Sequence, residues 1–216
     1  MKKLLLAIVS LLLIVGCYGP SHMNSAPEIK PKSEIPPIFI TYTSENLFSI
    51  SYPPELIPDN EMIEEIFRDT KEIIETTAPE ITVEGTQFVF IGHIPIDEKY
   101  AAFLLISLGP MPAGMTLDKY MEGEFQYERN NLMGFLEYSQ AKTTIDGREA
   151  IILDYRTFDF ETGEQRNLDL FTTKDGLLWN VGCSADPEEF KNYECTFYNI
   201  LKSFRILTHW WSRWVS

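Results

Sequence analysis

Residues 133–184 read MGFLEYSQAKTTIDGREAIILDYRTFDFETGEQRNLDLFTTKDGLLWNVGCS, and their pattern is the clearest structural signal in the sequence. Three turn signals, Asp146-Gly147, Thr162-Gly163 and Asp175-Gly176, separate four runs in which apolar and polar residues alternate. An Asp-Gly pair between such runs favours a tight hairpin, because both central residues of a type I′ turn need a positive φ. The stretch therefore predicts a meander of four antiparallel strands.

The segments upstream of the meander predict further strands. Residues 47–53, 86–94 and 100–108 are short runs rich in β-branched and aromatic side chains, and the residues at 95–99 suit a turn. The run at 100–108 is apolar on both of its faces, which is typical of a strand in a sheet that is covered on both sides.

Three segments have the apolar spacing of amphipathic helices. Residues 60–77 place five apolar side chains on one face: Ile63, Ile66, Phe67, Ile73 and Ile74. A second helix is predicted to run from the capping residue Thr116 to about residue 131 with Leu117, Tyr120 and Met121 inward. A third is predicted over 186–204, with an inward stripe made by Phe190, Phe197, Leu201 and Phe204.

This order of elements predicts an α+β fold, an α/β/α sandwich in which helices cover both faces of a central antiparallel sheet. We expect the globular domain to span residues 39–207, with a tryptophan-rich tail at 208–216. One domain of this size is large enough to bury a packed core.

The N-terminus has the pattern of an export signal. Two lysines precede an apolar run of thirteen residues that ends at Cys17, which is short for a membrane span of about 20 residues. Ile14-Val15-Gly16-Cys17 resembles a prokaryotic lipobox, which implies that residues 1–16 are cleaved and that Cys17 receives a diacylglyceryl group. Two acyl chains give stable membrane attachment, whereas one gives marginal binding. An uncleaved anchor and plain secretion are the alternatives.

Residues 17–38 are expected to form the lipidated cysteine and a tether. The stretch 18–37 holds five prolines and no helical or strand periodicity, which is typical of an extended linker. The predicted location is therefore the extracytoplasmic face of a cell membrane.

The charge of the mature chain is strongly negative. Without Lys2 and Lys3, 16 basic residues remain against 32 acidic ones, which gives a formal charge of −16. This balance disfavours nucleic acid as a partner and disfavours electrostatic adhesion to anionic lipid. Cationic partners and metal ions stay open, and the charge also serves solubility.

The cysteines and the tail give candidate sites. Cys183 and Cys195 lie twelve residues apart and could form a disulfide, or could be one buried side chain and one exposed thiol, since spacing alone does not fix their separation. The tail HWWSRWV contains Trp210, Trp211 and Trp214, which could contact a membrane interface or a partner protein, or could fold back over the core.

The sequence gives little sign of catalysis. Only His93 falls within the domain, since His22 lies in the tether and His209 in the tail. We expect His93 to be a structural or surface residue, and no nucleophile elbow, metalloprotease, Walker or dinucleotide motif is found. We expect no cofactor and no enzymatic activity, with a hydrolase built on carboxylates such as Asp154 and Glu164 as an alternative.

An acidic hairpin is a second alternative. Calcium and manganese prefer clustered oxygen ligands, and several carboxylates lie close together in the sequence: Asp154, Asp159, Glu161, Glu164 and Asp169. Their spacing is not that of an EF-hand, and a solvated turn carrying ordinary negative charge explains them equally well.

Three fragments resemble the PsbP-like family. They are FSISYPPEL at 48–56, TTIDGREAIILDY at 143–155, and DGLLWNVGCSADPEEFKNYECTFYNILKSFRIL at 175–207. The resemblance implies an α/β/α sandwich that is usually exported and often lipid-anchored in prokaryotes. Its plant and cyanobacterial members are accessory proteins of photosystem II. Because the matching residues are turn glycines, core aromatics and a helix stripe, they imply a fold and no transferable site.

The sequence thus predicts a non-enzymatic, lipid-anchored accessory or binding protein of the cell envelope. Its expected partners are the membrane, through the lipid on Cys17, and an envelope protein that the sequence does not identify.

Overall fold

A computed structural model describes residues 38–44, 47–59, 61–64, 68, 85–96, 99–131, 135–159 and 163–207. The strands are β1 (Ile40–Thr43), β2 (Phe48–Tyr52), β3 (Ile57–Pro58), β4 (Gln87–Ile96), β5 (Lys99–Pro110), β6 (Glu137–Ile145), β7 (Arg148–Asp159), β8 (Gly163–Lys174), β9 (Leu177–Ala185) and β10 (Arg205–Ile206). The two labelled helices are α3 (Leu117–Asn131) and α4 (Pro187–Ser203).

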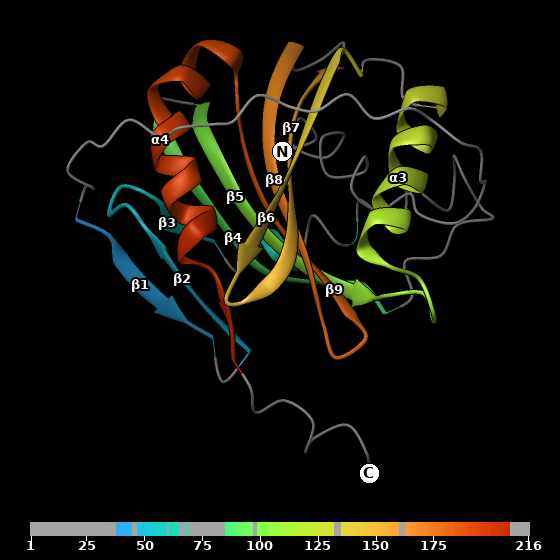
Figure 1. Cartoon of the computed structure of the whole chain (residues 1–216). Helices are drawn as coiled ribbons and strands as arrows, with labels where there is room; N and C mark the ends of the chain where they lie inside the picture. The colour runs from blue at the N-terminus through green and yellow to red at the C-terminus, as the bar shows by residue number, and fades with distance from the viewer. Residues whose placement is uncertain are drawn as a thin grey trace.

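A seven-stranded antiparallel sheet forms the centre of the molecule, in the order β3-β4-β5-β9-β8-β7-β6. Helices α3 and α4 lie on opposite sides of it (Figure 1). The predicted α+β class with helices on both faces is confirmed. The meander is also confirmed, since β6, β7, β8 and β9 pair in chain order.

The two Asp-Gly turns of the meander have the backbone geometry that the sequence predicts, whereas Thr162 of the third predicted turn lies outside the described residues. Asp146 and Gly147 have φ values of 53° and 73°, and Asp175 and Gly176 have values of 54° and 77°. Four positive φ values in two Asp-Gly pairs are those of type I′ turns. These turns fix the register, so that Ile145 lies opposite Arg148 and Lys174 lies opposite Leu177.

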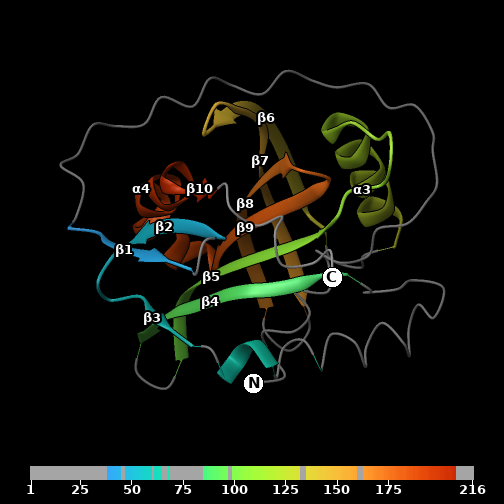
Figure 2. The ribbon, with the colours of Figure 1, turned by 90° about the horizontal axis from the view of Figure 1, so that it is seen from below.

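A separate three-stranded sheet in the order β1-β2-β10 lies beside α4 (Figure 2). The predicted strand at 47–53 therefore belongs to this small sheet and not to the central one. Arg205 pairs with Ser49, and Ser203 Oγ, at the end of α4, donates to the carbonyl of Ser51 at 3.2 Å. The chain just after α4 thus completes a sheet that begins near residue 40.

The helix signals are confirmed where the structure describes them. Thr116 caps α3, since its Oγ1 accepts from the amide of Lys119 at 3.4 Å. Helix α4 ends at Ser203, one residue short of the predicted stripe, and Phe204 continues as buried extended chain. Only the first turn, 61–64, and residue 68 of the predicted helix at 60–77 lie among the described residues.

The β4–β5 connection is shorter than expected. Strand β4 runs to Ile96 and β5 begins at Lys99, so residues 95, 96 and 99 of the predicted turn belong to strands. The pairing shifts register between Ile94 and Pro95, as expected where proline interrupts a ladder.

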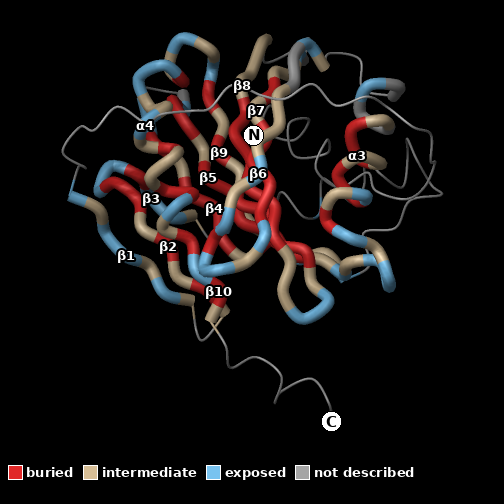
Figure 3. Tube along the Cα trace, viewed as in Figure 1, coloured by how far each residue is buried: buried red, intermediate tan, exposed pale blue. Residues whose placement is uncertain are grey.

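The core is divided by the central sheet (Figure 3). Between this sheet, α4 and the small sheet lies a large apolar cluster that includes Phe48, Trp179, Phe197 and Phe204. On the other side α3 packs over Ile151, Leu153 and Phe171, and the turn at 61–64 packs over Phe88, Ile91 and Leu105. Among the described residues, no helix is long and apolar enough to cross a membrane.

Candidate functional site

Buried polar side chains collect on the face of the central sheet that α3 covers. We call them the buried polar cluster, and each is at most 5% exposed: Ser107, Glu124, Asn167, Asp169 and Asn180. The register explains their proximity, because Ser107 lies opposite Asn180 and Asp169 lies opposite Gly182 on neighbouring strands. Glu124 comes from α3. This concentration is unusual for an interior, where polar groups carry a desolvation cost.

Asp169 is the most perturbed carboxyl among the described residues. Burial raises its pKa from 3.8 to about 7, and the hydrogen bond from Tyr155, with the nearby Asn180 amide, opposes part of that rise. Tyr155 Oη donates to Asp169 Oδ2 at 3.0 Å. Gly182 makes room for the carboxyl, because a Cβ there would lie 2.7 Å from Asp169 Oδ1. The site can therefore hold or release a proton near neutral pH.

Asn180 is the second unusual member of this cluster. Its amide lies near enough to influence Asp169, yet neither its nitrogen nor its oxygen has a hydrogen bond of acceptable geometry with the protein. A buried amide without partners costs free energy unless water or another polar group meets it. The buried polar cluster therefore contains polar groups whose burial lowers the stability of the fold.

A second polar arrangement, the Arg166 clamp, lies on the opposite face beneath α4. Arg166 donates to both carboxylate oxygens of Asp154 at 3.0 and 2.7 Å and to Glu194 of α4 at 3.0 Å. Its guanidinium also lies 4.3 Å from the centre of the Phe190 ring. The bidentate bond to Asp154 raises the pKa of Arg166, mainly through that hydrogen bond. The clamp holds α4 to the β7–β8 hairpin.

The clamp also affects a neighbouring tyrosine. Burial raises the pKa of Tyr198 to about 12, and the negative charges of Asp154 and Glu194 add to the rise. Tyr198 therefore stays protonated at neutral pH and acts as a neutral group at the α4 interface.

The carboxylates of the predicted acidic hairpin do not gather into one site where the structure describes them. Asp154 lies opposite Leu168 and Asp169 lies opposite Leu153, so the two acids point to opposite faces of the sheet. Glu164 accepts from Arg156 at 3.3 Å. Glu161 and the side chain of Asp159 lie outside the described residues. Within the described ranges, no three His, Cys, Asp or Glu side chains are placed to hold a metal ion.

His93 lies half-buried in β4. Its Nδ1 is 4.0 Å from Asp59 Oδ2, and its ring centre is 4.5 Å from that of Tyr100. It is the histidine that the sequence placed in the domain, and it packs on an aromatic neighbour. His22 and His209 lie outside the described residues, as do the lipidation candidate Cys17 and the interface candidates Trp210, Trp211 and Trp214.

The two domain cysteines are free thiols in different environments. Cys183 is buried in the cluster beneath α4, and Cys195 is exposed on α4. Burial, followed by the nearby charge of Asp169, raises the pKa of Cys183 well above its usual value. Cys183 is therefore an inert core side chain, whereas Cys195 faces solvent.

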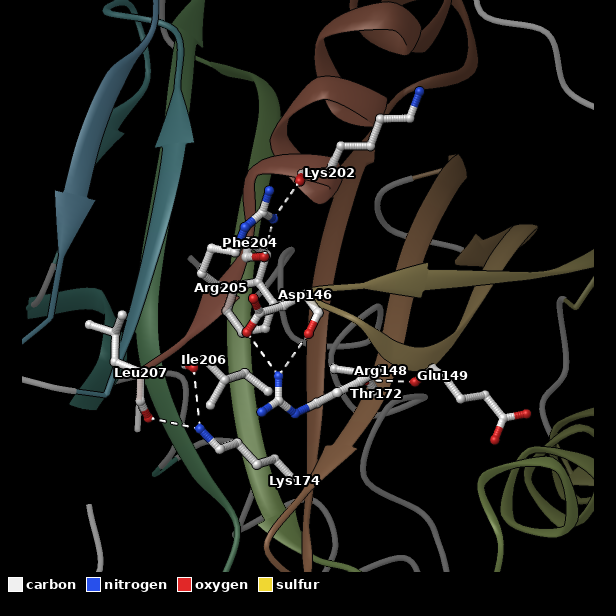
Figure 4. A network of polar contacts seen from close by, with 10 residues as sticks. All are labelled: Asp146, Arg148, Glu149, Thr172, Lys174, Lys202, Phe204, Arg205, Ile206 and Leu207. Atoms are coloured by element: carbon white, nitrogen blue, oxygen red, sulfur yellow. Dashed lines mark hydrogen bonds and ion pairs between the residues drawn. The ribbon is translucent and has the colours of Figure 1, made fainter. Parts of the chain in front are cut away.

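The last described residues of the chain are held by a lysine of β8. Lys174 Nζ donates to the carbonyls of Ile206 and Leu207 at 3.3 and 3.1 Å (Figure 4). Leu207 N also donates to the Leu47 carbonyl at 2.9 Å. Residues 206 and 207 are thus held beside Leu47 and the end of β8.

Sequence reasoning placed Asp169 near the acidic hairpin but missed its burial and its partners. A signal was present, because Asp169 stands between Leu168 and Leu170 in a run, NLDLF, that is apolar on both sides. An acid at the centre of such a run predicts a buried carboxyl. Its bond to Tyr155, fourteen residues away, depends on strand pairing and has no local signature.

The comparisons with known proteins bear on the fold. A comparison with known family profiles and with curated protein sequences finds no match. Among solved structures, a protein of unknown function from Pseudomonas aeruginosa, PA94, is 11% identical with a TM-score of 0.47, over 76% of this chain and 94% of that one. LpqN of Mycobacterium tuberculosis, described as involved in cell envelope biogenesis, is 14% identical with a TM-score of 0.43, over 58% of this chain and 80% of that one.

A cyanobacterial PsbP, from Synechocystis sp. PCC 6803, gives a higher TM-score, 0.51. It is 14% identical, and the match covers 87% of this chain and 99% of that one. The resemblance that the sequence fragments suggested is therefore confirmed at the level of architecture, and the domain has a PsbP-like fold.

Proposed function

We propose that this protein is a non-enzymatic, lipid-anchored accessory protein that binds a partner at the extracytoplasmic face of a cell membrane. The observation that carries the proposal is the lipobox-like run ending at Cys17, followed by the proline-rich stretch and then by a PsbP-like domain. A diacylated cysteine anchors the chain, and the tether allows the domain to reach a neighbour.

The charge distribution supports membrane attachment through lipid. With a formal charge of −14 for the whole chain, the protein would be repelled by anionic headgroups. The acyl chains would then be the main attachment, and the acidic domain would be held in the aqueous space, where it can meet a cationic or polar partner.

The Arg166 clamp supports a binding role over hydrolysis at Asp154. A carboxylate that receives two hydrogen bonds from one guanidinium is committed to that ion pair. Glu164, the other acid considered for a hydrolase, is engaged by Arg156. These carboxylates therefore have structural partners that explain their presence.

The experiment that tests the anchor is intact-mass analysis with membrane fractionation in a bacterial host. The wild type is expected to lose residues 1–16, gain the mass of a diacylglyceryl group and sediment with membranes. Cys17→Ser should remain uncleaved. Cys195→Ser, which removes an exposed thiol elsewhere, is the matched control and should behave as the wild type. Soluble or unprocessed wild-type protein would overturn the anchor.

Partner binding is tested separately by cross-linking in intact cells. Lipidated wild type should give discrete cross-linked species with one envelope protein, and Cys17→Ser should lose them. The metal-binding alternative is tested by melting with calcium, manganese or a chelator. A ligand of the native state must raise the melting temperature, so we expect no change, and a clear rise would favour the alternative.

A further inference from the structure

The two edges of the central sheet differ in length and in protection. One edge is β3, which has two residues and ends with Pro58. The other is β6, which has nine residues and, among the described residues, pairs only with β7. Short strands and proline protect an edge, whereas a long regular strand is a template for another strand.

The hairpin geometry shows which main-chain groups of β6 face away from β7. In a two-residue type I′ hairpin the residues that flank the turn, here Ile145 and Arg148, exchange hydrogen bonds. Alternation then directs the N–H and C=O of Thr144 and Lys142 outward. Glu149, which lies opposite Thr144, is consistent with this alternation. Its carbonyl points away from β6 and towards β8, where Thr172 Oγ1 donates to it at 2.8 Å.

From this geometry we infer that β6 is a self-association edge, at which a second copy of this chain adds its own β6 antiparallel across a two-fold axis at Thr143. In that register the main chains of Lys142 and Thr144 exchange hydrogen bonds with Thr144 and Lys142 of the second copy. The two Thr143 side chains meet at the axis as a close, non-hydrogen-bonded pair, and cross-strand threonine pairs are favourable. The central sheets of the two copies become continuous.

Charge is the reason for choosing a second copy in this register. The chain is strongly acidic, yet residues 138–145 contain one lysine and no carboxylate, so two copies can approach along this strand with little repulsion. The two-fold at Thr143 places Lys142 diagonally across from Asp146 of the second copy on one side and from Lys142 of the second copy on the other, where Asp118 of its own copy already balances the charge of each lysine. Lys142 already contacts Asp118 at 2.5 Å, and Asp146 contacts Arg148 at 2.8 Å, the latter drawn in Figure 4. The contact between Lys142 and Asp146 of the second copy therefore links the Lys142–Asp118 pair of one copy to the Asp146–Arg148 pair of the other.

A single strand pair buries less area than a standard stable interface. We therefore expect weak association in solution, and the test traps it covalently. The mature chain, residues 17–216, carrying Cys17→Ser and Cys195→Ser retains only the buried Cys183 as a native thiol and lacks the apolar N-terminal run. Thr143→Cys in this background places two thiols at the axis, at the Cβ separation of about 4.5–5.5 Å expected for an antiparallel pair.

Under mild oxidation at about 100 µM protein, Thr143→Cys should give a disulfide dimer at least about tenfold faster than Ala141→Cys, because only the pair at the axis has the separation that a disulfide requires. Ala141→Cys is the matched control, because it lies on the same strand and the same face but away from the axis. Equal rates for the two variants, no dimer, or a dimer only with Ala141→Cys would overturn the proposal. If no self-pairing is found, a strand of another protein becomes the alternative candidate to pair with β6.

Two further variants examine the mechanism in the Thr143→Cys background. Thr144→Pro removes an outward N–H and leaves the β7 ladder intact, so the cross-link should disappear while the melting curve stays cooperative. Lys142→Glu should slow cross-linking at low salt, with partial recovery at high salt. Persistence of the cross-link in both folded variants would show that β6 pairing is not its cause.

Discussion

The two faces of the central sheet are built from different chemistry. Beneath α4 the face is filled by aromatic and aliphatic side chains, with Trp179 in contact with Phe48 and Phe204 at ring-centre distances of 6.2 and 5.7 Å. Its charged residues, Arg166 and Asp154, lie towards the rim and are about one-fifth exposed. Beneath α3 the apolar packing is interrupted by the buried polar cluster.

Apolar burial is thus concentrated on the α4 face and buried polar groups on the α3 face. The α4 face buries large apolar side chains, which is the main source of folding free energy. The α3 face carries a buried acid, whose desolvation opposes folding when the carboxyl is charged. Truncating a core side chain on the α4 face should therefore destabilise the protein, whereas neutralising the buried acid on the α3 face should stabilise it above the pH at which that acid ionises.

The largest loss of folding stability is expected when Trp179 is substituted. Trp179→Ala removes a nearly inaccessible side chain from the α4 face and leaves a cavity, so the free energy of unfolding should fall by about 3–5 kcal/mol. Trp179→Phe should cost clearly less, because the indole N–H has no protein hydrogen-bond partner to lose. Urea unfolding measures both. Equal costs would show that the indole nitrogen matters more than the ring volume.

Substitution of Asp169 by asparagine is expected to increase folding stability by an amount that depends on pH. Because the folded pKa is raised from 3.8 to about 7, the folded state binds the proton more tightly, and stability is lost as pH rises from about 4 to about 7. A shift of this size corresponds to roughly 4 kcal/mol. Asp169→Asn should remove this dependence and be more stable than the wild type at pH 8, with little difference at pH 4.

The difference between the Asp169→Asn and wild-type unfolding free energies should be followed from pH 4 to pH 8. Using the difference cancels the contributions of the other carboxylates. A difference that stays constant across this range would contradict the perturbed pKa.

An intermediate loss is expected at the Arg166 clamp. Arg166→Met removes the bidentate bond to Asp154 and the contact to Glu194, and leaves two partly buried acids without their cation. We expect a loss of about 2 kcal/mol, below the value for a fully buried pair because the group is partly exposed. Arg156→Met, whose pair with Glu164 is more exposed, is the matched control and should cost under about 0.5 kcal/mol. Denaturant unfolding of the two variants and of the wild type measures these losses from the shifts of the midpoints.

The smallest effects compare two glycines that serve the α3 face. Gly182→Ala would place a Cβ 2.7 Å from Asp169 Oδ1, and moving that carboxyl should cost about 1–2 kcal/mol. Gly123→Ala lies in α3 with no atom within 4 Å of the added Cβ, and should stabilise the protein by up to about 1 kcal/mol. Thermal melts of the two variants should therefore shift in opposite directions. A shift in the same direction would contradict the close approach at Gly182.

Local patterns predicted the fold well where they impose a local geometry. Asp146-Gly147 and Asp175-Gly176 predicted hairpins because few residues accept a positive φ. Thr116 predicted the start of α3 because its hydroxyl satisfies an amide of the first turn. The inward stripe of α4 followed from helical periodicity, and Phe190, Phe197 and Leu201 are buried as expected.

The candidate site was predicted less well. The acids between 154 and 169 were grouped by their closeness in sequence, but strand alternation separates Asp154 from Asp169. The Arg166 clamp was not predicted, since Glu194 joins it from a helix twenty-eight residues away.

The amino-acid sequence was sufficient to predict the Asp-Gly turns, the start of α3 and the apolar stripe of α4, because each depends on neighbouring residues. The tertiary structure was needed to show that β2 pairs with β1 and β10 and not with the central sheet. That pairing brings Ser49 beside Arg205, which is distant in the sequence. The raised pKa of Asp169 is likewise a property of the tertiary structure. Burial depends on what α3 covers, and Tyr155 reaches the carboxyl only after β7 and β8 have paired.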